Sequence, residues 1–356
     1  MGKKEKYYKL DNILAKNCEY NVILGERSNG KSFAVKSYCI AQFLKEGDMF
    51  VYLRRWDLDV KKKNVDKYFS DAALHDLIRN WSHGRYDSVV FYSGDLYLAT
   101  TQPDGDIVRK VKCGYVVSLS ADTHFKSLNL PEVGNIIFEE FVTKTMYLDD
   151  EITAFFSIIS TVARRKMLKV WLIGNTISRL CPYFAEWSLT HVPKQKQGTI
   201  DIYHQKTKND HIINIAVELC TDIVEKSMVF GKSASMANSG EWECDSYPNL
   251  PYNYREYELC YSAAVEKYNM RYMIELLRHN SIYVAYVHTI KNTIPAKCKR
   301  LITDNYSDNP LQTKYLTVVT KGDNILLRLI KNYKVCYSDN LTGTEFNTLL
   351  EGGDLI

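Results

Sequence analysis

The sequence predicts an α/β protein in which a parallel-sheet core is followed by a small linker subdomain and a second α/β domain. In the first half of the chain, apolar runs of strand length alternate with helical patterns. These runs lack the apolar–polar alternation of a half-exposed strand, so we expect a parallel sheet that is buried on both faces. The composition turns polar near residue 178, and apolar runs return near residue 254.

The elements of the first half follow from these patterns. Apolar side chains at helical spacing predict helices over residues 32–47 and 149–163. Residues 53–81 and 89–99 are expected to be insertions, the second of them a hairpin. The predicted strands are residues 20–24, 49–55, 115–120, 135–140 and 169–175.

The second half is less regular. Residues 192–210 are polar and predict a linker or a small hairpin subdomain. Residues 228–253 are rich in Gly, Ser, Asn and Pro, which predicts irregular structure. Strands are expected over residues 271–279, 282–288 and 314–320, and a helix over residues 324–334. The resulting division is a first domain over 1–177, a linker subdomain over 178–227 and a second domain over 228–356.

Composition restricts the class of protein. The net charge of +4 over 356 residues permits a polyanionic partner without requiring one. The 9 cysteines are scattered without a CxxC pair, which argues against a zinc ribbon and a disulfide scaffold. The charged start, MGKKEKYYKL, does not fit a signal peptide, and no apolar run reaches membrane-spanning length. We therefore expect a soluble cytosolic protein that is not bound to a membrane.

A glycine-rich loop follows the first predicted strand and fits the pattern G-x-x-x-x-G-K-[ST]. In this pattern backbone N–H groups and the start of the next helix face phosphate oxygens, Lys31 reaches the β- and γ-phosphates, and Ser32 binds Mg²⁺. The loop predicts a P-loop NTPase core that binds ATP and Mg²⁺; a glycine-rich turn without a ligand is the alternative. Its residues are Gly25, Glu26, Arg27, Ser28, Asn29, Gly30, Lys31 and Ser32.

Two adjacent carboxylates, Glu139 and Glu140, end the predicted strand over residues 135–140. Open α/β sheets bind ligands at the carboxyl ends of their strands. Glu139 stands where an aspartate usually orders the water shell of Mg²⁺, so we predict that it holds the metal together with Ser32. Glu140 is predicted to polarise the attacking water as general base. A solvated acidic turn is the alternative.

The next predicted strand ends in Asn175. A side-chain amide at this position can sense the γ-phosphate or hold the attacking water. A helix-capping asparagine is an equal alternative.

Several blocks of the sequence, taken in order and spacing, resemble the DNA-packaging (encapsidation) ATPases of small short-tailed bacteriophages whose genomes carry a terminal protein. The resemblance is dense from about Val22 to Phe184 and thinner afterwards. The order and spacing of the blocks make it specific, whereas GKS alone would not be. The blocks are GERSNGKSFAVK, FVYLRRW, the segment from SLS to NIIFEEF, TVARR and GNTISRLCPYF.

The resemblance implies an ATPase of the additional-strand, catalytic-glutamate class that forms a homomeric ring, expected to be a pentamer. This ring would dock on the portal of a procapsid in the host cytoplasm and drive double-stranded DNA inward. The resemblance also implies a second domain with a ribonuclease H-like fold that lacks nuclease chemistry and in some members meets a packaging RNA. A two-metal nuclease needs several converging carboxylates. Here His288 holds the place of a strand-end aspartate, which leaves Asp304 and, less plausibly, Glu275.

Basic residues are candidates for DNA contacts. A pump that grips DNA of any sequence needs phosphate contacts, which flexible lysines provide. A solvated helix face is the alternative. The candidates are Lys61, Lys62 and Lys63 beyond the second predicted strand and Lys144 after the carboxylate strand. Lys291, Lys297, Lys299 and Arg300 offer a further basic group for RNA, DNA or portal.

Two arginines in TVARRK, Arg164 and Arg165, are candidates for a finger that acts on the site of a neighbouring subunit. Such an arginine contributes about 10³–10⁵ in rate. The resemblance places one arginine here, but this chain is one residue shorter; we prefer Arg164 and keep Arg165 as its alternate. By the same resemblance, Lys126 is a second cation. The alternative for each is a helix C-terminal cation or a surface charge.

These features predict ATP-driven translocation of double-stranded viral DNA into a procapsid, with hydrolysis at the subunit interfaces of a ring. The alternative is a regulatory P-loop ATP-binding switch that docks partners and hydrolyses slowly. Stimulation of hydrolysis by DNA separates the two functions.

Overall fold

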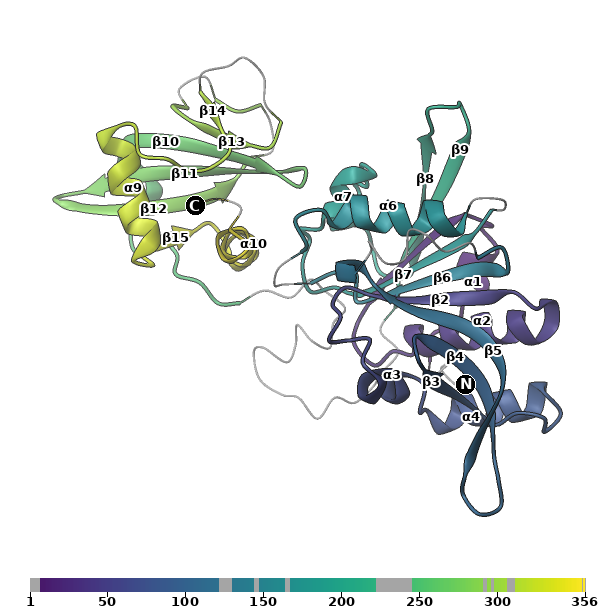
Figure 1. Cartoon of the computed structure of the whole chain (residues 1–356). Helices are drawn as coiled ribbons and strands as arrows, with labels where there is room; N and C mark the ends of the chain where they lie inside the picture. The colour runs from purple at the N-terminus through teal and green to yellow at the C-terminus, as the bar shows by residue number, and fades with distance from the viewer. Residues whose placement is uncertain are drawn as a thin grey trace, which may run out of the picture. The chain divides into compact units, whose positions relative to one another are not determined.

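The computed structural model divides the chain into two compact units, each of which is described by itself (Figure 1). Unit 1 comprises Met1–Val142, Leu148–Thr176 and Lys194–Glu241, and unit 2 comprises Thr143–Tyr147, Ile177–Pro193 and Trp242–Ile356. The expected linker segment 178–227 is therefore shared between the two units. The structure describes residues 7–121, 130–143, 147–163, 167–221, 245–290, 293–295, 298–305, 311–353 and 355.

The core of unit 1 is a mixed sheet with a parallel centre. Its strands are β1 (Tyr20–Gly25), β2 (Met49–Arg54), β3 (Ser88–Tyr92), β4 (Asp95–Thr101), β5 (Ile107–Ser118), β6 (Val133–Glu139), β7 (Lys169–Asn175), β8 (Thr199–Lys206) and β9 (Ile212–Leu219). Among the described residues they form a 9-stranded sheet in the order β3-β4-β5-β2-β6-β7-β1-β9-β8. Strands β5, β2, β6, β7, β1 and β9 run parallel. The first five of these were predicted from the apolar runs, and β9 was not.

Helices cover both faces of this sheet (Figure 1). Helix α2 (Lys31–Glu46) buries Val35 and Ile40 in the same cluster as the strand residue Ile137. Helix α6 (Glu151–Val162) lies on the other face, where the rings of Phe155 and Phe138 are 5.8 Å apart. Apolar side chains therefore point to both sides of the parallel strands. The remaining helices of unit 1 are α1 (Asp11–Leu14), α3 (Lys62–Tyr68) and α4 (Ala72–Trp81), with a short 3-10 helix at Leu119–Ala121.

Unit 2 is built on a second sheet. Its strands are β10 (Glu258–Lys267), β11 (Met270–His279), β12 (Ile282–Thr289), β13 (Leu301–Thr303), β14 (Gln312–Thr313) and β15 (Val335–Tyr337). Within the described part of the chain their order is β14-β13-β10-β11-β12-β15. Helices α9 (Lys321–Lys331) and α10 (Asn340–Glu351) pack their apolar residues, including Leu326 and Phe346, against one face. Unit 2 also contains α7 (Pro182–Glu186) and a 3-10 helix at Tyr254–Glu256; another 3-10 helix, Val192–Lys194, falls where the two units adjoin along the chain.

The structure differs from the sequence-based expectation at residues 314–320 and in strands β9 and β10, which were not predicted. The strand predicted over 314–320 is wrong, because β14 ends at Thr313 and the following residues carry no strand. The first three residues of strand β9 are exposed or half-buried, and the later ones are buried. Hairpin β8–β9 overlaps the segment for which we expected a linker or a small hairpin subdomain, and it extends the sheet of unit 1. Across the described ranges, no helix is long and apolar enough to cross a membrane.

Arg55, directly after β2, holds the chain that follows β6. Its Nε and Nη2 donate to the two carboxylate oxygens of Glu151 at 2.8 Å each. The guanidinium also donates to the carbonyl oxygens of Glu140 at 3.0 Å and Phe141 at 2.7 Å. Arg55 and Glu151 are only 5% and 2% exposed, so the ion pair is buried. One side chain thereby joins β2, the turn after β6 and the first turn of α6.

We predict that Arg55→Met lowers the free energy of unfolding by about 3–5 kcal/mol, because the Glu151 carboxylate stays buried without its cation. Chemical denaturation of the full chain measures this loss. The matched control is Arg79→Met, which removes an exposed ion pair to Asp76 and is expected to cost at most about 1 kcal/mol. Equal losses in the two variants would contradict the role given to Arg55.

Candidate active site

The phosphate loop connects β1 to α2, in the strand–loop–helix context that the motif requires. Ser28 and Gly30 have φ values of +61° and +91°, which turn the chain back from the strand into the helix. At Gly25 a Cβ atom would lie 2.9 Å from the Cβ of Cys220, so the neighbouring strand leaves room only for glycine. The glycines of the motif thus have separate tasks, one in the turn and one in close packing.

Lys31 is 5% exposed and reaches the ends of two strands. Its Nζ donates to the carbonyl oxygens of Gly25, at 3.3 Å, and Glu26. It also donates to the side-chain oxygen of Asn175, the last residue of β7, at 2.8 Å. Burial lowers the pKa of Lys31 to about 8, although the charge of Glu139 opposes the shift. The structure therefore brings the predicted phosphate-binding lysine and the predicted sensor asparagine together.

Glu139, the last residue of β6, is a buried carboxylate surrounded by donors. Tyr52 donates its hydroxyl to Oε2, and Lys36 Nζ lies 3.3 Å from the same oxygen. Burial alone would raise the pKa of Glu139, but the charge of Lys36, the hydrogen bonds from Ser32 and Tyr52 and the charge of Arg54 lower it to about 2. Glu139 is therefore ionised at neutral pH. A hydroxyl beside an ionised carboxylate is a set of hard oxygen ligands that suits Mg²⁺.

Glu140 occupies the position after β6 in a left-handed conformation, with φ of +60°. Its backbone N–H donates to the carbonyl of Ile173 on β7 at 2.8 Å. The side chain is 64% exposed and accepts a hydrogen bond from Arg54 Nη2 at 2.6 Å. Arg54 Nη1 is also 3.9 Å from Glu139, so a single buried guanidinium lies between the two glutamates.

The strand order explains why these side chains meet. Strand β7 lies between β1 and β6, so one additional strand separates the phosphate loop from the carboxylates, as the resemblance implies. Gly25, Arg54, Glu139 and Asn175 are the last residues of four parallel strands. Carboxyl ends of parallel strands share one edge of the sheet, which is where α/β proteins bind ligands.

Sequence reasoning missed the support behind the loop. Tyr8 donates its backbone N–H to the carbonyl of Asn29 at 2.9 Å and its hydroxyl to Glu218 on β9 at 2.6 Å. The side chain of Asn29 also contacts the thiol of Cys220. No local pattern reveals these contacts, because Tyr8 and Glu218 are 210 residues apart in the chain.

Sequence reasoning also missed Lys36, Tyr52 and Arg54 as members of the site. A charged residue at the end of an apolar strand was a usable signal for Arg54. Lys36 lies within a helix, so the sequence does not distinguish it from a surface lysine. Tyr52 lies within an apolar strand, so the sequence does not distinguish it from a core aromatic residue.

The structure describes three of the four lysines that were predicted to contact DNA. Lys61, Lys62 and Lys63 are exposed at the start of α3, and Lys62 pairs with Asp66 at 2.7 Å. Their exposure fits both a DNA contact and a solvated helix face. Six predicted residues lie outside the described part of the chain, namely Lys126, Lys144, Arg164, Arg165, Lys291 and Lys297.

In unit 2, the acidic residues considered for a nuclease have separate partners. Glu275 accepts a hydrogen bond from Tyr254 at 2.8 Å, and its Oε2 is 3.6 Å from Nε2 of His288. Asp304 pairs instead with Lys267 at 3.2 Å. Among the residues that the structure describes, no group of three or more His, Cys, Asp or Glu side chains is arranged to hold a metal ion.

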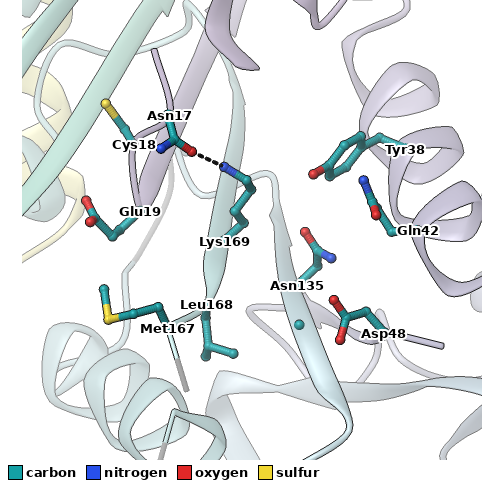
Figure 2. A pocket seen from close by; sticks show the side chains of 11 residues that line it. Asn17, Cys18, Glu19, Tyr38, Gln42, Asp48, Asn135, Met167, Leu168 and Lys169 are labelled. Atoms are coloured by element: carbon teal, nitrogen blue, oxygen red, sulfur yellow. Dashed lines mark hydrogen bonds between the residues drawn. The ribbon is translucent and has the colours of Figure 1, made fainter. Parts of the chain in front are cut away.

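A polar pocket of about 360 Å³ lies at the opposite edge of the same sheet (Figure 2). It is lined by residues at the amino ends of strands, including Asp48 before β2, Asn135 near the start of β6 and Lys169 at the start of β7. Lys169 Nζ donates to the side-chain oxygen of Asn17 at 3.4 Å, as Figure 2 shows. Because the phosphate loop is at the carboxyl ends, this pocket is not part of the candidate active site.

The fold and the site together define an α/β protein of the P-loop class. Residues 1–246 match the family described as Podovirus DNA encapsidation protein (Gp16), and the chain belongs to this family. The family predicted from the sequence blocks is thereby confirmed.

Individual relatives agree with the family assignment. The DNA packaging protein of Bacillus phage phi29 is 27% identical over 251 residues, which cover 68% of this chain and 66% of the relative. A chain of the bacteriophage Phi-29 viral genome packaging motor assembly is similar in structure, with a TM-score of 0.58 and 19% identity over 98% of this chain and 99% of that one. A chain of the Phi-28 gp11 DNA packaging motor has a TM-score of 0.54 and 16% identity, with 98% of both chains covered. These structural similarities establish the fold.

The geometry of the site assigns different roles to Lys31, which is expected to bind the nucleotide, and Glu140, which is expected to act after the nucleotide has bound. We predict that Lys31→Ala weakens nucleotide affinity at least tenfold (about 1.4 kcal/mol), because it removes the cation at the phosphates. Glu140→Gln is expected to bind ATP with nearly unchanged affinity and to stall, because the amide keeps the volume but cannot accept the proton. Titration of both variants with a fluorescent ATP analogue measures the two affinities. An equal loss of binding would show that Glu140 has another role.

Proposed function

We propose that the protein is an ATPase that drives double-stranded viral DNA into a procapsid and hydrolyses ATP at the subunit interfaces of a homomeric ring. The observation that carries this proposal is the convergence of Lys31, Ser32 and two adjacent glutamates at one edge of a parallel sheet. It occurs in a chain of the DNA encapsidation family. The phi29 relative, described as a DNA packaging protein, supports the same function.

Each residue of the site has a proposed task. Lys31 binds the β- and γ-phosphates, and Asn175, its hydrogen-bond partner, senses the γ-phosphate. Ser32 and Glu139 hold Mg²⁺, which when bound offsets phosphate charge. Glu140 polarises the attacking water as general base.

The contact between Arg54 and Glu140 bears on this last task. The Glu140 oxygen that accepts the hydrogen bond from Arg54 Nη2 at 2.6 Å is directed at the guanidinium and not at an attacking water. The side chain of Glu140 is 64% exposed and can turn away from Arg54 without breaking core packing. We therefore propose that Glu140 leaves this contact before it acts on water.

The proposed partners follow from the family and from the surface. Lys61, Lys62, Lys63 and Lys144 are proposed to contact DNA phosphates, which suits translocation of any sequence. The ring is proposed to be a pentamer that docks on the portal of a procapsid in the host cytoplasm, with a packaging RNA as a further partner. The second α/β domain is proposed to be ribonuclease H-like and without nuclease activity. The phi29 motor assembly with a similar fold supports a ring as the working form.

The rate of ATP hydrolysis by a DNA-translocating ATPase should depend on the presence of DNA. We predict that double-stranded DNA and procapsids together raise the rate of phosphate release by the assembled protein several-fold above the rate of protein alone. Glu140→Gln serves as the control for contaminating ATPases. A rate that neither DNA nor procapsids change would favour the alternative, a regulatory ATP-binding switch that docks partners without translocating DNA.

Arg164 is proposed to act on the nucleotide of the neighbouring subunit, with Arg165 as its alternate and Lys126 as a second cation. Subunits with Glu140→Gln keep an intact finger, whereas subunits with Arg164→Ala keep an intact site. Mixed rings are therefore expected to recover hydrolysis at junctions where an intact site meets an intact finger. Mixed rings that form, as shown by co-purification of two differently tagged variants, but remain as inactive as both parents would contradict a finger acting in trans.

A further inference from the structure

The carboxylate of Glu139 is held from one side. The contacts of Tyr52, Lys36 and Arg54 all fall on the same oxygen, Oε2. Tyr52 donates a hydrogen bond to this oxygen, Lys36 Nζ is 3.3 Å from it, and Arg54 Nη1 is 3.9 Å from it. Ser32, on the phosphate loop, also contacts the carboxylate. The carboxylate of Glu139 therefore has contacts both with this set of donors and with the phosphate loop.

Glutamate at this position raises a geometric problem. P-loop enzymes usually place an aspartate there, and glutamate is longer by one methylene, which extends the carboxylate by about 1.5 Å. Without a restraint, the longer side chain would have additional rotamers and would not hold one position beside Ser32. Some feature of the fold has to fix the additional torsion.

We propose that Lys36 and Tyr52 are positioning residues that draw back the carboxylate of Glu139, so that a glutamate presents its oxygen to Ser32 and Mg²⁺ as an aspartate would. This inference rests on the proposed function, because it assigns Glu139 to the metal. It adds a pair of residues behind the carboxylate, one from helix α2 and one from strand β2. Both residues act through Glu139, the carboxylate that they contact.

The surroundings of Lys36 suit a rigid anchor. The side chain is 7% exposed, and its Nζ donates to the carbonyl of Tyr68 at 2.9 Å. The rings of Tyr52, Tyr68 and Phe69 lie between 5.3 and 5.8 Å from the same ammonium. The carbonyl and the ring faces fix the position of the Lys36 ammonium. The position of the ammonium therefore determines where the carboxylate of Glu139 can lie when the two form an ion pair.

Tyr52 is equally fixed. It is fully buried, and its ring packs edge-on against Phe69 at a centroid distance of 5.2 Å. Its hydroxyl is therefore held in place by the core, not by the site. Removal of this hydroxyl leaves the ring packing in place and takes away only the hydrogen bond to Glu139.

An ion pair that merely stabilises the core is the competing explanation, and the metal dependence of nucleotide binding separates the two. The first variant is Tyr52→Phe in the full chain, with affinity for a fluorescent ATP analogue measured in EDTA and across a Mg²⁺ titration. We expect the affinity in EDTA to stay within about twofold of the wild type. The Mg²⁺ concentration that gives half of the metal-dependent increase in affinity should rise about tenfold, as loss of a hydrogen bond to a charged group predicts.

The control is Tyr38→Phe, which removes a hydroxyl from the same helix as Lys36. Tyr38 lines the polar pocket at the opposite edge of the sheet and faces Gln42 from the same helix (Figure 2). Its loss should leave the Mg²⁺ dependence unchanged. A shift of equal size in Tyr38→Phe and Tyr52→Phe would show a general effect of the substitution and would overturn the assignment.

A second variant keeps the test independent of stability. Glu139→Asp shortens the side chain, so its carboxylate lies where the proposal places the drawn-back carboxylate of Glu139 and does not need the anchor. Adding Tyr52→Phe to Glu139→Asp should therefore change the Mg²⁺ requirement by less than about twofold, because the shorter side chain does not depend on the anchor. Additive shifts would overturn the proposal. Equal loss of affinity in EDTA and in Mg²⁺ for Tyr52→Phe would likewise assign it a structural role.

Failure of the proposed function gives a different result. If the loop does not bind nucleotide, the wild-type chain shows no affinity for the analogue in EDTA or in Mg²⁺. If nucleotide binds but no variant of Glu139 or its anchors changes the Mg²⁺ requirement, the loop assignment stands and the positioning role of Lys36 and Tyr52 fails.

Discussion

The ionised carboxylate of Glu139 is the group on which the arrangement of the site depends. It is 9% exposed, and a buried carboxylate without partners would cost several kcal/mol of folding free energy. Donors from two elements compensate for this cost: Ser32 and Lys36 from α2, and Tyr52 and Arg54 from β2. The loop, the helix and the two strands are therefore tied to one another through a single charged group.

Charge compensation extends outward from that carboxylate. Arg54 links Glu139 to the more exposed Glu140, whereas Arg55 holds the backbone of Glu140 and the buried Glu151 at the start of α6. Two consecutive arginines at the end of β2 thus have different roles. Arg54 contacts the side chains of the two glutamates, and Arg55 contacts the backbone of the turn after β6. This places Glu140 at the surface of the site in a left-handed conformation, a position from which its carboxylate can face water.

The sequence predicted the parts of the fold and site that depend on local patterns. The phosphate loop, the parallel strands around it and the pair of glutamates follow from spacing alone, and the structure places Lys31 and Asn175 in contact at the edge where we expected them. The strand predicted over 314–320 is wrong, because the run LTVVT has strand propensity but pairs with no strand among the described residues. Val318 and Val319 are 52% and 68% exposed, which fits a segment outside the sheet.

Contacts between distant segments could not be predicted. Tyr8 and Glu218 support the loop from positions 210 residues apart, and nothing near either residue indicates the other. Lys36 has the same limitation, because a lysine in an amphipathic helix is usually solvated and only the fold shows that this one is buried beside a carboxylate. Strand β10 was missed because its centre, Ser262 to Ala264, consists of small residues with weak strand propensity.

A structure of the Glu140→Gln protein with ATP and Mg²⁺ tests the central claim most directly. The account predicts that the phosphates lie on the loop from Gly25 to Ser32, that Lys31 exchanges its carbonyl partners for phosphate oxygens, and that the metal lies beside Ser32 and Glu139. Nucleotide bound elsewhere, for example in the polar pocket at the amino ends of the strands, or a metal held by other side chains, would contradict it.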